Sequence, residues 1–524
     1  MENRGGAVMS IDTNYDAIVV GAGPNGLMAA AYLQQAGNRV LLCERRHETG
    51  GGLNTDEYFG FRFNLHAIYH LMAEKMPAWE DLNLADLGVR YLYPHVVAAW
   101  PFKDGSSLVF TRDVKETAES IAQFSADDAK SYLAMWDAFQ PMLDDYLIPM
   151  TYELPLPALD QLTAFTETPV GEALSEISEM DMLELVDFYG FTHPRIRMAL
   201  LSFPAMWGIN VEDPLGFLFP LYLGRMMDAA FVKGGSHRLS SALFRSFVAA
   251  GGTVVDENEV AKILMEDDVV VGVRLADGSE FRADAVISTL NPVQTFGQLL
   301  NSDEVPPLLA QKVDKWEWEE RSLFGVHLGI DGAVNYRAAA ADPRINEAMT
   351  VFIGPETEDE LLDHLESIDD GSCTGPQWLH ITLPSVHDAT MAPPGHTVLR
   401  AEAVVAYDPA WRERSKDYAA RCIDLIKEHA EIGEVVLQRE VSPVDIEQKL
   451  TTMTRGSYKH GAYSTLQLGF LRPNDLCSHS ETPIEGLYLG GASMYPGGMI
   501  LGACGYLAAQ VVGEFLEKPI ITRG

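Results

Sequence analysis

The glycines near the start of the chain have the spacing of a dinucleotide-binding loop. Residues 15–44 read YDAIVVGAGPNGLMAAAYLQQAGNRVLLCE, in which Gly21, Gly23 and Gly26 form GxGxxG. The loop follows an apolar strand and precedes a helical segment and a second strand, the order of a βαβ unit. Here the first glycine allows the tight turn, the second lets the main chain approach a pyrophosphate, and the third allows close helix–strand packing. The segment therefore predicts a dinucleotide site.

The residues around this loop suit a phosphate and a ribose. Pro24 fits the first helical position, because the N–H that proline lacks would be unpaired there anyway. Phosphate oxygens would then lie at the helix N-terminus, which favours anions. Glu44, 23 residues after Gly21, is placed to accept hydrogen bonds from a ribose. The motif by itself leaves FAD and NAD open.

A second group of glycines lies near the end of the chain. Residues 486–506 read GLYLGGASMYPGGMILGACGY, with seven glycines in 21 residues. Glycine is used where the chain needs unusual torsions, or where another group approaches the main chain too closely for a Cβ atom. A bound ligand and a glycine-rich turn both remain compatible with this pattern.

Polar side chains that could take part in catalysis are few. His66 and His70 are four residues apart, a spacing that would place both on one helical face as ligands or acid–base groups, or simply as hydrogen-bonding residues. No third ligand can be identified from the spacing, so no metal site is predicted. Tyr495, beside the second glycine group, is a candidate proton donor or ring wall. We take His66 and Tyr495 as the catalytic candidates.

Composition and charge limit the class of protein. The chain has 524 residues, 47% of them apolar, and a formal charge of -37, which opposes binding to nucleic acid and to anionic lipid. The five cysteines include no CxxC pair, which favours a reducing compartment. Neither a transmembrane segment nor a signal peptide is expected, and the leader 1–14 is expected to be a loose tail. The predicted location is cytoplasmic, and peripheral membrane contact stays compatible with a lipophilic substrate.

The pattern of elements changes along the chain. Residues 125–146 and 170–189 have helical periodicity, in a region whose Met, Phe, Trp and Tyr suit either a lipophilic cavity or a helical core. A helix over 239–250 is followed by a series of strands, and further strands are expected at 323–330 and 397–407. This alternation fits a nucleotide-binding domain that is interrupted by insertions and resumed later.

With these segments in view, residues 15–509 resemble the phytoene desaturase superfamily of FAD-dependent carotenoid oxidoreductases. The similarity is greatest to β-carotene ketolases and to proteins named for a pyridine nucleotide-disulfide oxidoreductase domain. After the first motif, ERRHETGGG matches the second signature of the large FAD family, with Gly52 where arginine is usual. The other supporting stretches are GFRFNLHAIYH (60–70), KGGSHRLSSAL (233–243), LPSVHDATMAPPGHT (383–397), QLGFLRP (467–473) and the second glycine group.

The resemblance implies an α/β fold: a discontinuous Rossmann-type FAD-binding domain of the glutathione reductase kind, with a mixed α+β substrate domain and a helical cap. The FAD-binding domain would comprise 15–72, 231–296 and 446–515, and the substrate domain 73–230 and 297–445.

The resemblance also implies which residues hold the cofactor. The chain would return to the first domain at its end, where Gly490 and Gly491 make room for FAD and a helix beginning near Gly498 points its N-terminus at the flavin. Met499 replaces a small residue and would intrude toward the substrate side of the ring, and the segment with His460 and Tyr463 would border the site. The expected FAD-binding residues are Gly21, Gly23, Pro24, Asn25, Gly26, Glu44, Arg45, Arg46, Gly51, Gly52, Val260 (through its main chain, to adenine), Gly491, Ala492, Gly498, Met499 and Ile500.

The function implied is an FAD-dependent oxidoreductase that transfers hydride between flavin N5 and a hydrophobic, unsaturated, carotenoid- or isoprenoid-like substrate. Desaturation, saturation and isomerisation of C=C bonds all remain open. So do an amine oxidase-like activity on the same fold and a flavin-binding scaffold with little catalysis. The expected partner is a small lipophilic molecule, with oxygen, quinone or NAD(P) as the electron acceptor; no second GxGxxG occurs for a separate NAD domain.

Overall fold

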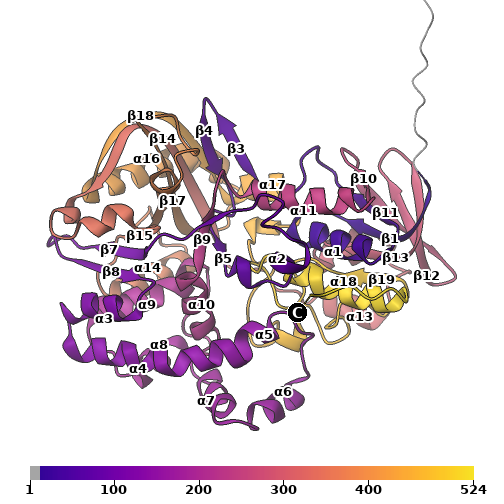
Figure 1. Cartoon of the computed structure of the whole chain (residues 1–524), viewed down its shortest axis with the longest axis horizontal. Coiled ribbons are helices and arrows are strands. Elements are labelled where there is room, and N and C mark those ends of the chain that lie inside the picture. Colours follow the sequence, from indigo (N-terminus) through magenta and orange to yellow (C-terminus); the bar gives the residue numbers. More distant parts are fainter. Residues whose placement is uncertain (1–11, 524) are drawn as a thin grey trace, which may run out of the picture.

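The computed structural model describes residues 12–523 and contains two seven-stranded sheets (Figure 1). The first is centred on β1 (Asn14–Val20), which pairs in parallel with β2 (Val40–Cys43) and β13 (Glu280–Ser288). Its strands come from three separate stretches of the chain, so the predicted discontinuous Rossmann-type arrangement is confirmed. The other members are β10 (Thr253–Val255), β11 (Val260–Glu266), β12 (Val269–Leu275) and β19 (Leu487–Leu489).

Three helices pack beside the first sheet. The central helix, α1 (Pro24–Gln35), is buried along most of its length and contacts α11 (His237–Ala249) and α18 (Ala503–Phe515). A Cβ atom on Gly26 would lie 1.9 Å from the carbonyl oxygen of Gly21, and one on Gly505 would lie 1.9 Å from that of Asn25. These two glycines therefore allow α1 to contact the preceding turn and the last helix.

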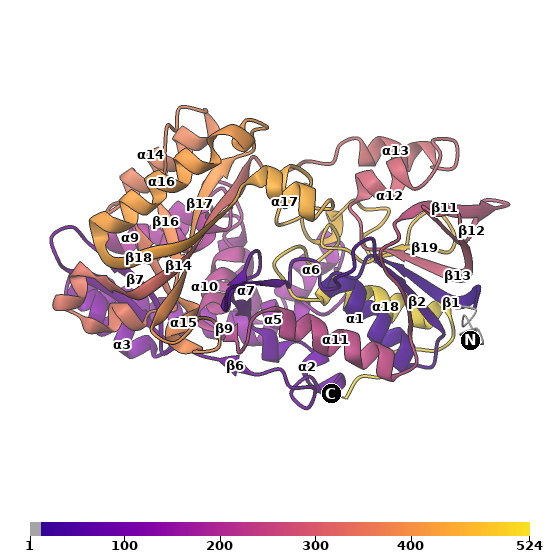
Figure 2. The ribbon, with the colours of Figure 1, turned by 90° about the horizontal axis from the view of Figure 1, so that it is seen from above.

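The second sheet is mostly antiparallel. Its longest strand, β14 (Arg321–Tyr336), pairs with β17 (His396–Ala406) and β18 (Ala430–Val441), so the strands predicted at 323–330 and 397–407 are confirmed. Figure 2 shows the two sheets side by side, with α17 (Pro443–Lys449) between them. The remaining strands are β16 (Leu379–Thr382), β15 (Thr350–Ile353), β7 (Val96–Pro101) and β8 (Ser107–Thr111), and the helices beside them are α14 (Glu358–Asp369) and α16 (Trp411–His429).

A helical layer lies below the second sheet in Figure 1. The helix predicted at 125–146 is α4 (Ala126–Met142) followed by a π-helical turn, and Ser125 caps its start by accepting a hydrogen bond from the Asp128 N–H. The helix predicted at 170–189 is divided in two, because Asp181 and Glu184 form a capping box that starts a new helix. The layer comprises α3 (Val114–Ala122), α4, α5 (Ile148–Met150), α6 (Ala158–Phe165), α7 (Pro169–Ser178), α8 (Met182–Phe188), α9 (Pro194–Met206) and α10 (Leu218–Met227).

Aromatic packing joins this layer to the second sheet. The Trp100 ring stacks on Phe352 at a centroid distance of 5.1 Å and meets Phe203 of α9 edge-on at 5.6 Å. All three side chains are buried, and offset or edge-on aromatic pairs add to the stabilisation from burial. The helical layer and the second sheet therefore share one core.

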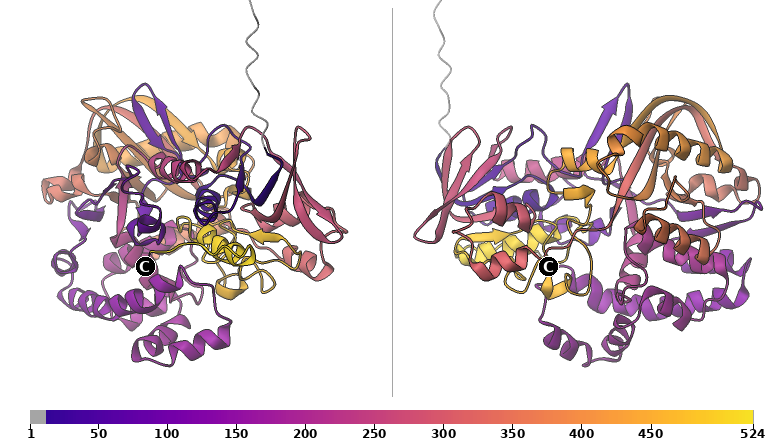
Figure 3. Two further views of the ribbon diagram at one scale, coloured as in Figure 1. Left: turned by 45° about the vertical axis from the view of Figure 1, so that its right-hand side comes forward. Right: turned by 180° about the vertical axis from the view of Figure 1, so that it is seen from behind.

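Short elements connect the two sheets, which Figure 3 shows from two further sides. The strands β5 (His70–Leu71), β9 (Ala229–Val232) and β6 (Tyr91–Leu92) form a small sheet between them. None of the helices in residues 12–523 has the length and apolar character needed to span a membrane. The expected loose leader lies largely outside the described residues. The other elements are β3 (Thr55–Tyr58), β4 (Phe61–Asn64), α2 (Ala78–Asp81), α12 (Pro292–Gln298), α13 (Pro307–Val313) and α15 (Pro384–His387).

Candidate functional site

The main cavity lies where the segments that cross between the sheets meet. It contains about 2060 Å³ of space free of protein atoms, part of it open to solvent. Its walls come from the loop after β1, the crossing segment 65–71, the last residue of α17 with residues 450–453 after it, and residues 498–501 before α18. One cavity therefore joins the predicted nucleotide loop to side chains of the second sheet.

The loop after β1 is held against the end of β2. The Gly21 N–H donates to the Cys43 carbonyl at 2.8 Å, and the Ala22 N–H donates to Glu44 Oε2 at 2.8 Å. The second carboxylate oxygen of Glu44 accepts from the Arg46 N–H at 3.0 Å. Glu44 is 8% exposed and lines the cavity. The carboxylate is thus fixed in place with lone pairs left for a ribose.

Gly23 provides a test of whether this cradle fits a cofactor. A Cβ atom at this position would meet no protein atom within 4 Å, although Gly23 lines the cavity and immediately precedes α1. Protein packing therefore gives no reason for glycine here, whereas close approach of a ligand to the main chain does. The cradle fits the pyrophosphate of FAD at the N-terminus of α1.

Most of the other predicted cofactor residues line the same cavity. Val260 does so at the start of β11, and Arg45, whose Nη2 donates to the Lys449 carbonyl at 2.7 Å, does so beside Arg46. Gly491 is the one predicted cofactor residue that does not line this cavity. The remaining predicted residues that do are Gly21, Pro24, Asn25, Gly26, Gly51, Gly52, Ala492, Gly498, Met499 and Ile500.

The second glycine group packs mainly against protein, which corrects one expectation. A Cβ atom on Gly490 would lie 2.9 Å from Ala508 Cβ, and one on Gly491 would lie 2.3 Å from the Thr289 carbonyl oxygen. These two glycines make room for the chain itself rather than for FAD. The helix also begins later than expected, at Ala503, so the main chain of Gly498 and Met499 lies in turns that precede it.

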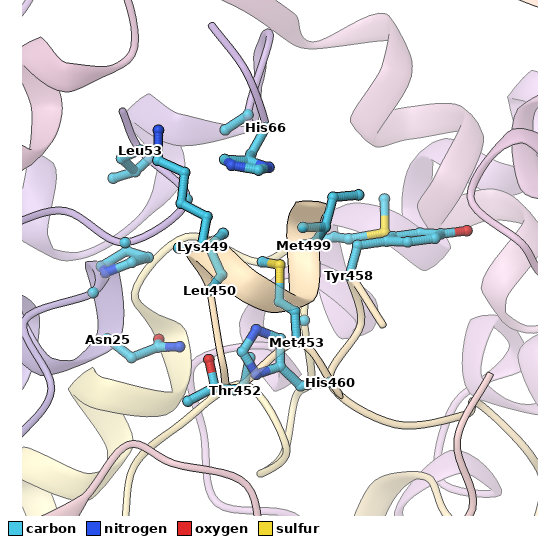
Figure 4. Close-up of a pocket in the computed structure, with 18 of the residues that line it drawn as sticks. Asn25, Leu53, His66, Lys449, Leu450, Thr452, Met453, Tyr458, His460 and Met499 are labelled. Atoms are coloured by element: carbon cyan, nitrogen blue, oxygen red, sulfur yellow. The ribbon is translucent and has the colours of Figure 1, made fainter. Parts of the chain in front are cut away.

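His66 lies at the cavity with a free ring nitrogen (Figure 4). Among the described residues, none forms a hydrogen bond with its Nε2 atom. Burial, followed by the charges of Arg400, Lys449 and Arg46, lowers the pKa of His66 to about 3. The imidazole is therefore neutral at neutral pH and can orient a ligand by hydrogen bonding, but it has no proton to donate as an imidazolium.

The other sequence candidates are placed differently. His70 belongs to β5 rather than to a helix shared with His66, and its Nδ1 lies 2.9 Å from the Tyr91 hydroxyl oxygen. Tyr495 lies outside the cavity, and its hydroxyl donates to the Met150 carbonyl at 2.6 Å. This position corrects the expectation that Tyr495 is catalytic, because its proton is committed to a structural hydrogen bond.

Two further side chains that line the cavity, those of Tyr458 and His460, have unpaired polar atoms. The Tyr458 hydroxyl and His460 Nδ1 are buried without a partner among the described residues, and both residues line the cavity. Burial, followed by the charge of Arg472, lowers the pKa of His460 to about 4. Figure 4 shows Tyr458, His460, Met499 and His66 facing the same space. The Tyr463 hydroxyl instead donates to the Gly498 carbonyl at 2.8 Å.

A polar network in the cavity wall was missed by the sequence analysis. Arg400 and Glu402, two residues apart on β17, form a buried ion pair. His380 of β16 is the register partner of Glu402, and its Nδ1 lies 3.5 Å from Glu402 Oε2. The Tyr69 hydroxyl oxygen lies 3.4 Å from His380 Nε2. All four residues line the cavity.

The charges of this network are balanced. Burial, the largest single effect, raises the pKa of the Glu402 carboxyl, but the Arg400 guanidinium and His380 together outweigh burial and hold that pKa below its ordinary value of 4.5. Burial raises the pKa of Tyr69 well above 10, so its phenol is neutral. The sequence did contain a signal for this ion pair. An Arg-x-Glu pair inside an apolar strand places two charged side chains on the same face of the sheet.

No metal-binding cluster accompanies these groups. Within residues 12–523, no set of three or more His, Cys, Asp or Glu side chains is arranged to hold an ion.

Comparison with known proteins assigns the chain to a family. Residues 25–512 match the family model described as flavin containing amine oxidoreductase. A limonene dehydrogenase subunit of Castellaniella defragrans is 38% identical over 95% of this chain and 94% of its own length. Pyridine nucleotide-disulfide oxidoreductase domain-containing protein 2 of Mus musculus is 28% identical over 98% and 96%. The crystal structure of an oxidoreductase from Methanosarcina mazei has a TM-score of 0.60 at 17% identity, over 95% of this chain and all of that one.

These findings confirm the resemblance drawn from the sequence, the predicted fold class and the predicted cofactor. The chain therefore belongs to the family of flavin-containing amine oxidoreductases and is an FAD-dependent oxidoreductase.

Proposed function

We propose that the protein is a dehydrogenase that oxidises an apolar, unsaturated, isoprenoid-type substrate. The observation that carries this proposal is the apolar wall of the cavity beyond the nucleotide loop. A 38% identical relative that is named as part of a limonene dehydrogenase supports it. The apolar lining residues are Leu65, Ala67, Ile68, Leu71, Met206, Trp207, Leu323, Met499 and Ile500.

FAD bound in the cradle accepts or donates hydride at its N5 atom. The chain's own contribution is to bind and orient the substrate and to exclude water. Apolar side chains give binding energy to a hydrocarbon through burial, at about 25 cal/mol per Å². Met499 projects from a left-handed turn (φ 66°) into this space and limits the shape of what can lie there.

Formation of a C=C bond also releases a proton, and the network on β16 and β17 offers a place for it. Removal of hydride from one carbon must be accompanied by loss of a proton from its neighbour. His380 Nε2 can take that proton, directly or through the Tyr69 hydroxyl, and Glu402 stabilises the resulting imidazolium by its charge. The apolar wall and this base together favour desaturation over simple binding.

An amine substrate is less well matched to the described residues. A cationic amine would be favoured by an unpaired carboxylate in the cavity. Glu44 is held by the nucleotide loop and Glu402 by Arg400, and Glu259 lies beside Val260 at the far end from the second sheet. Amines therefore serve as the comparison substrates in the flavin reduction experiment described next.

The test is anaerobic reduction of the purified flavoprotein, followed by its absorption spectrum. We expect the flavin band to bleach with a monocyclic or acyclic monoterpene and not with primary or secondary amines. Bleaching by amines alone would overturn the proposal in favour of an oxidase. Reoxidation by oxygen, by a quinone and by NAD(P)⁺, each measured after reduction, identifies the electron acceptor.

A further inference from the structure

Arg225 differs from every other buried arginine in the described chain. Four arginines are less than a tenth exposed, and three of them have partners: Arg321 pairs with Asp369, Arg400 with Glu402, and Arg472 donates to four main-chain carbonyls. Arg225 is 6% exposed, yet within residues 12–523 its guanidinium has no ion pair and no hydrogen bond.

Arg225 lines a second, smaller cavity. This cavity contains about 290 Å³ of space free of protein atoms, part of it open to solvent, and is lined by residues from the last turn of α10 and from the segment around α5. Arg225 shares it with Thr151, Tyr152 and Lys75, whose Nζ lies 3.7 Å from Asp228 at the surface. The other lining residues are Leu71, Met72, Ile148, Met499 and Ile500.

The small cavity adjoins the substrate end of the main one. Leu71, Met499 and Ile500 line both cavities, whereas no residue of the glycine loop lines the smaller one. The group that would pair with Arg225 is therefore not the pyrophosphate of FAD. A molecule in the main cavity would reach Arg225 past the residues that line both cavities, Met499 among them.

The chemistry around Arg225 leaves its charge uncompensated. Burial lowers the pKa of Arg225, and the groups that most offset this are tyrosines (Tyr222, Tyr463, Tyr152 and Tyr495) rather than carboxylates. A buried cation without an acceptor is strongly unfavourable, and other buried cations in proteins are paired. An arginine fork binds a planar carboxylate through two parallel hydrogen bonds.

We propose that the small cavity binds a carboxylate, and that this carboxylate is the head group of the enzyme's lipophilic substrate. Its apolar part would extend past Met499 into the main cavity. This second half rests on the function proposed above and narrows the substrate class from a neutral hydrocarbon to an isoprenoid or fatty acid. A small free carboxylate has the same chemistry, and the experiment separates the two.

The first experiment measures thermal unfolding of the ligand-free holoenzyme. Arg225→Met removes an unpaired buried charge, so we expect its Tm to equal or exceed that of the parent. Arg472→Met is the matched control, and its Tm should fall because it leaves four carbonyls without a donor. A fall for Arg225→Met as large as for the control would overturn the proposal, because it would show that Arg225 has a structural partner.

The second experiment measures binding by calorimetry, without turnover. We expect the parent protein to bind geranic acid at least tenfold more tightly than the matching alcohol, geraniol. Arg225→Met should lose this preference and Arg225→Lys should keep part of it. Equal affinity for acid and alcohol, or an unchanged preference in Arg225→Met, would overturn the carboxylate site.

Acetate separates the two sources of the carboxylate. Binding of geranic acid that is much tighter than that of acetate supports a substrate head group, whereas equal affinities that both depend on Arg225 would overturn the substrate assignment in favour of a free anion. Failure of the dehydrogenase proposal would be seen in a different experiment. In that case no lipophilic compound would bleach the flavin band, whatever affinity the protein has for acids.

Discussion

Glu44 Oε2 accepts a hydrogen bond of 2.8 Å from the Ala22 N–H, which fixes the acid at the end of β2 against the turn after β1. Glu44→Gln places an amide opposite the N–H of Ala22 or of Arg46, so one donor loses its acceptor. We expect FAD affinity to fall by about 1–3 kcal/mol, measured by flavin fluorescence titration. Glu280→Gln, on the same sheet but paired with Arg274 at the surface, is the control. Equal affinity in Glu44→Gln and parent would contradict the ribose contact.

Gly23 and Gly26 are three residues apart but should fail in different ways when replaced by alanine. A Cβ atom at Gly23 meets no protein atom, whereas one at Gly26 would lie 1.9 Å from the Gly21 carbonyl oxygen. We expect Gly23→Ala to fold with parent-like far-UV circular dichroism and bind little flavin. Gly26→Ala should lose stability even without flavin. If Gly23→Ala is isolated with full flavin content, the pyrophosphate does not lie at that position.

His66 makes a predictable contribution to acid sensitivity. Its pKa is about 3 in the folded chain against an ordinary value of 6.5, so between these values the unfolded state binds more protons. Stability is therefore lost as pH falls from 6.5 toward 3, with a slope approaching about 1.4 kcal/mol per pH unit for one group. His66→Gln should show a shallower loss than the parent in urea unfolding at pH 7, 6 and 5. Parallel curves would show that His66 is not buried as a neutral ring.

The base on β16 can be tested separately from its ion pair. We expect His380→Gln to lower kcat by about 10²–10⁴-fold with flavin content unchanged. His327→Gln is the matched control, since His327 is buried on β14 but does not line the cavity. A parent-like rate in His380→Gln would exclude His380 as the proton acceptor.

Glu402 should behave differently from His380. Glu402→Gln leaves Arg400 as a buried charge without its partner, so we expect destabilisation of about 3–5 kcal/mol in urea unfolding. The Arg400–Glu402 pair stabilises the fold at neutral pH and is lost as pH falls below 4.5, because the Glu402 pKa is depressed in the folded chain. A variant as stable as the parent at pH 7 would contradict the ion pair.

The nucleotide cradle could be predicted from the sequence because it is local. Gly21, Gly23 and Glu44 lie within one βαβ unit, whose strand and helix periods are visible in the chain itself. The start of the last helix was wrong because Met499 and Gly502 adopt left-handed torsions (φ 66° and 69°) that insert turns before it. No local pattern signals such torsions at a methionine.

The wall of the substrate cavity depended on contacts between distant segments. His380 reaches Glu402 only through the register of β16 and β17, and Tyr69 comes from a crossing segment more than 300 residues away in sequence. The charge pattern of Arg400 and Glu402 was visible, but which side of the sheet faces the cavity was not. Arg225, a cation within an apolar helix, was a similar signal whose meaning emerges only once its lack of a partner is known.

The packing of α1 against α18 limits how early during synthesis the cofactor site can form. The nucleotide cradle is synthesised well before β19, which starts at Leu487 and completes the same sheet, and before the helix that follows β19 and covers α1. At about 5–20 residues per second, synthesis of the segment between α1 and α18 takes roughly 25–95 s. The helical layer is continuous in sequence and can form early, whereas the cofactor-binding sheet and its helices stay incomplete until β19 and α18 have been synthesised. Tight binding of flavin therefore has to follow the synthesis of α18.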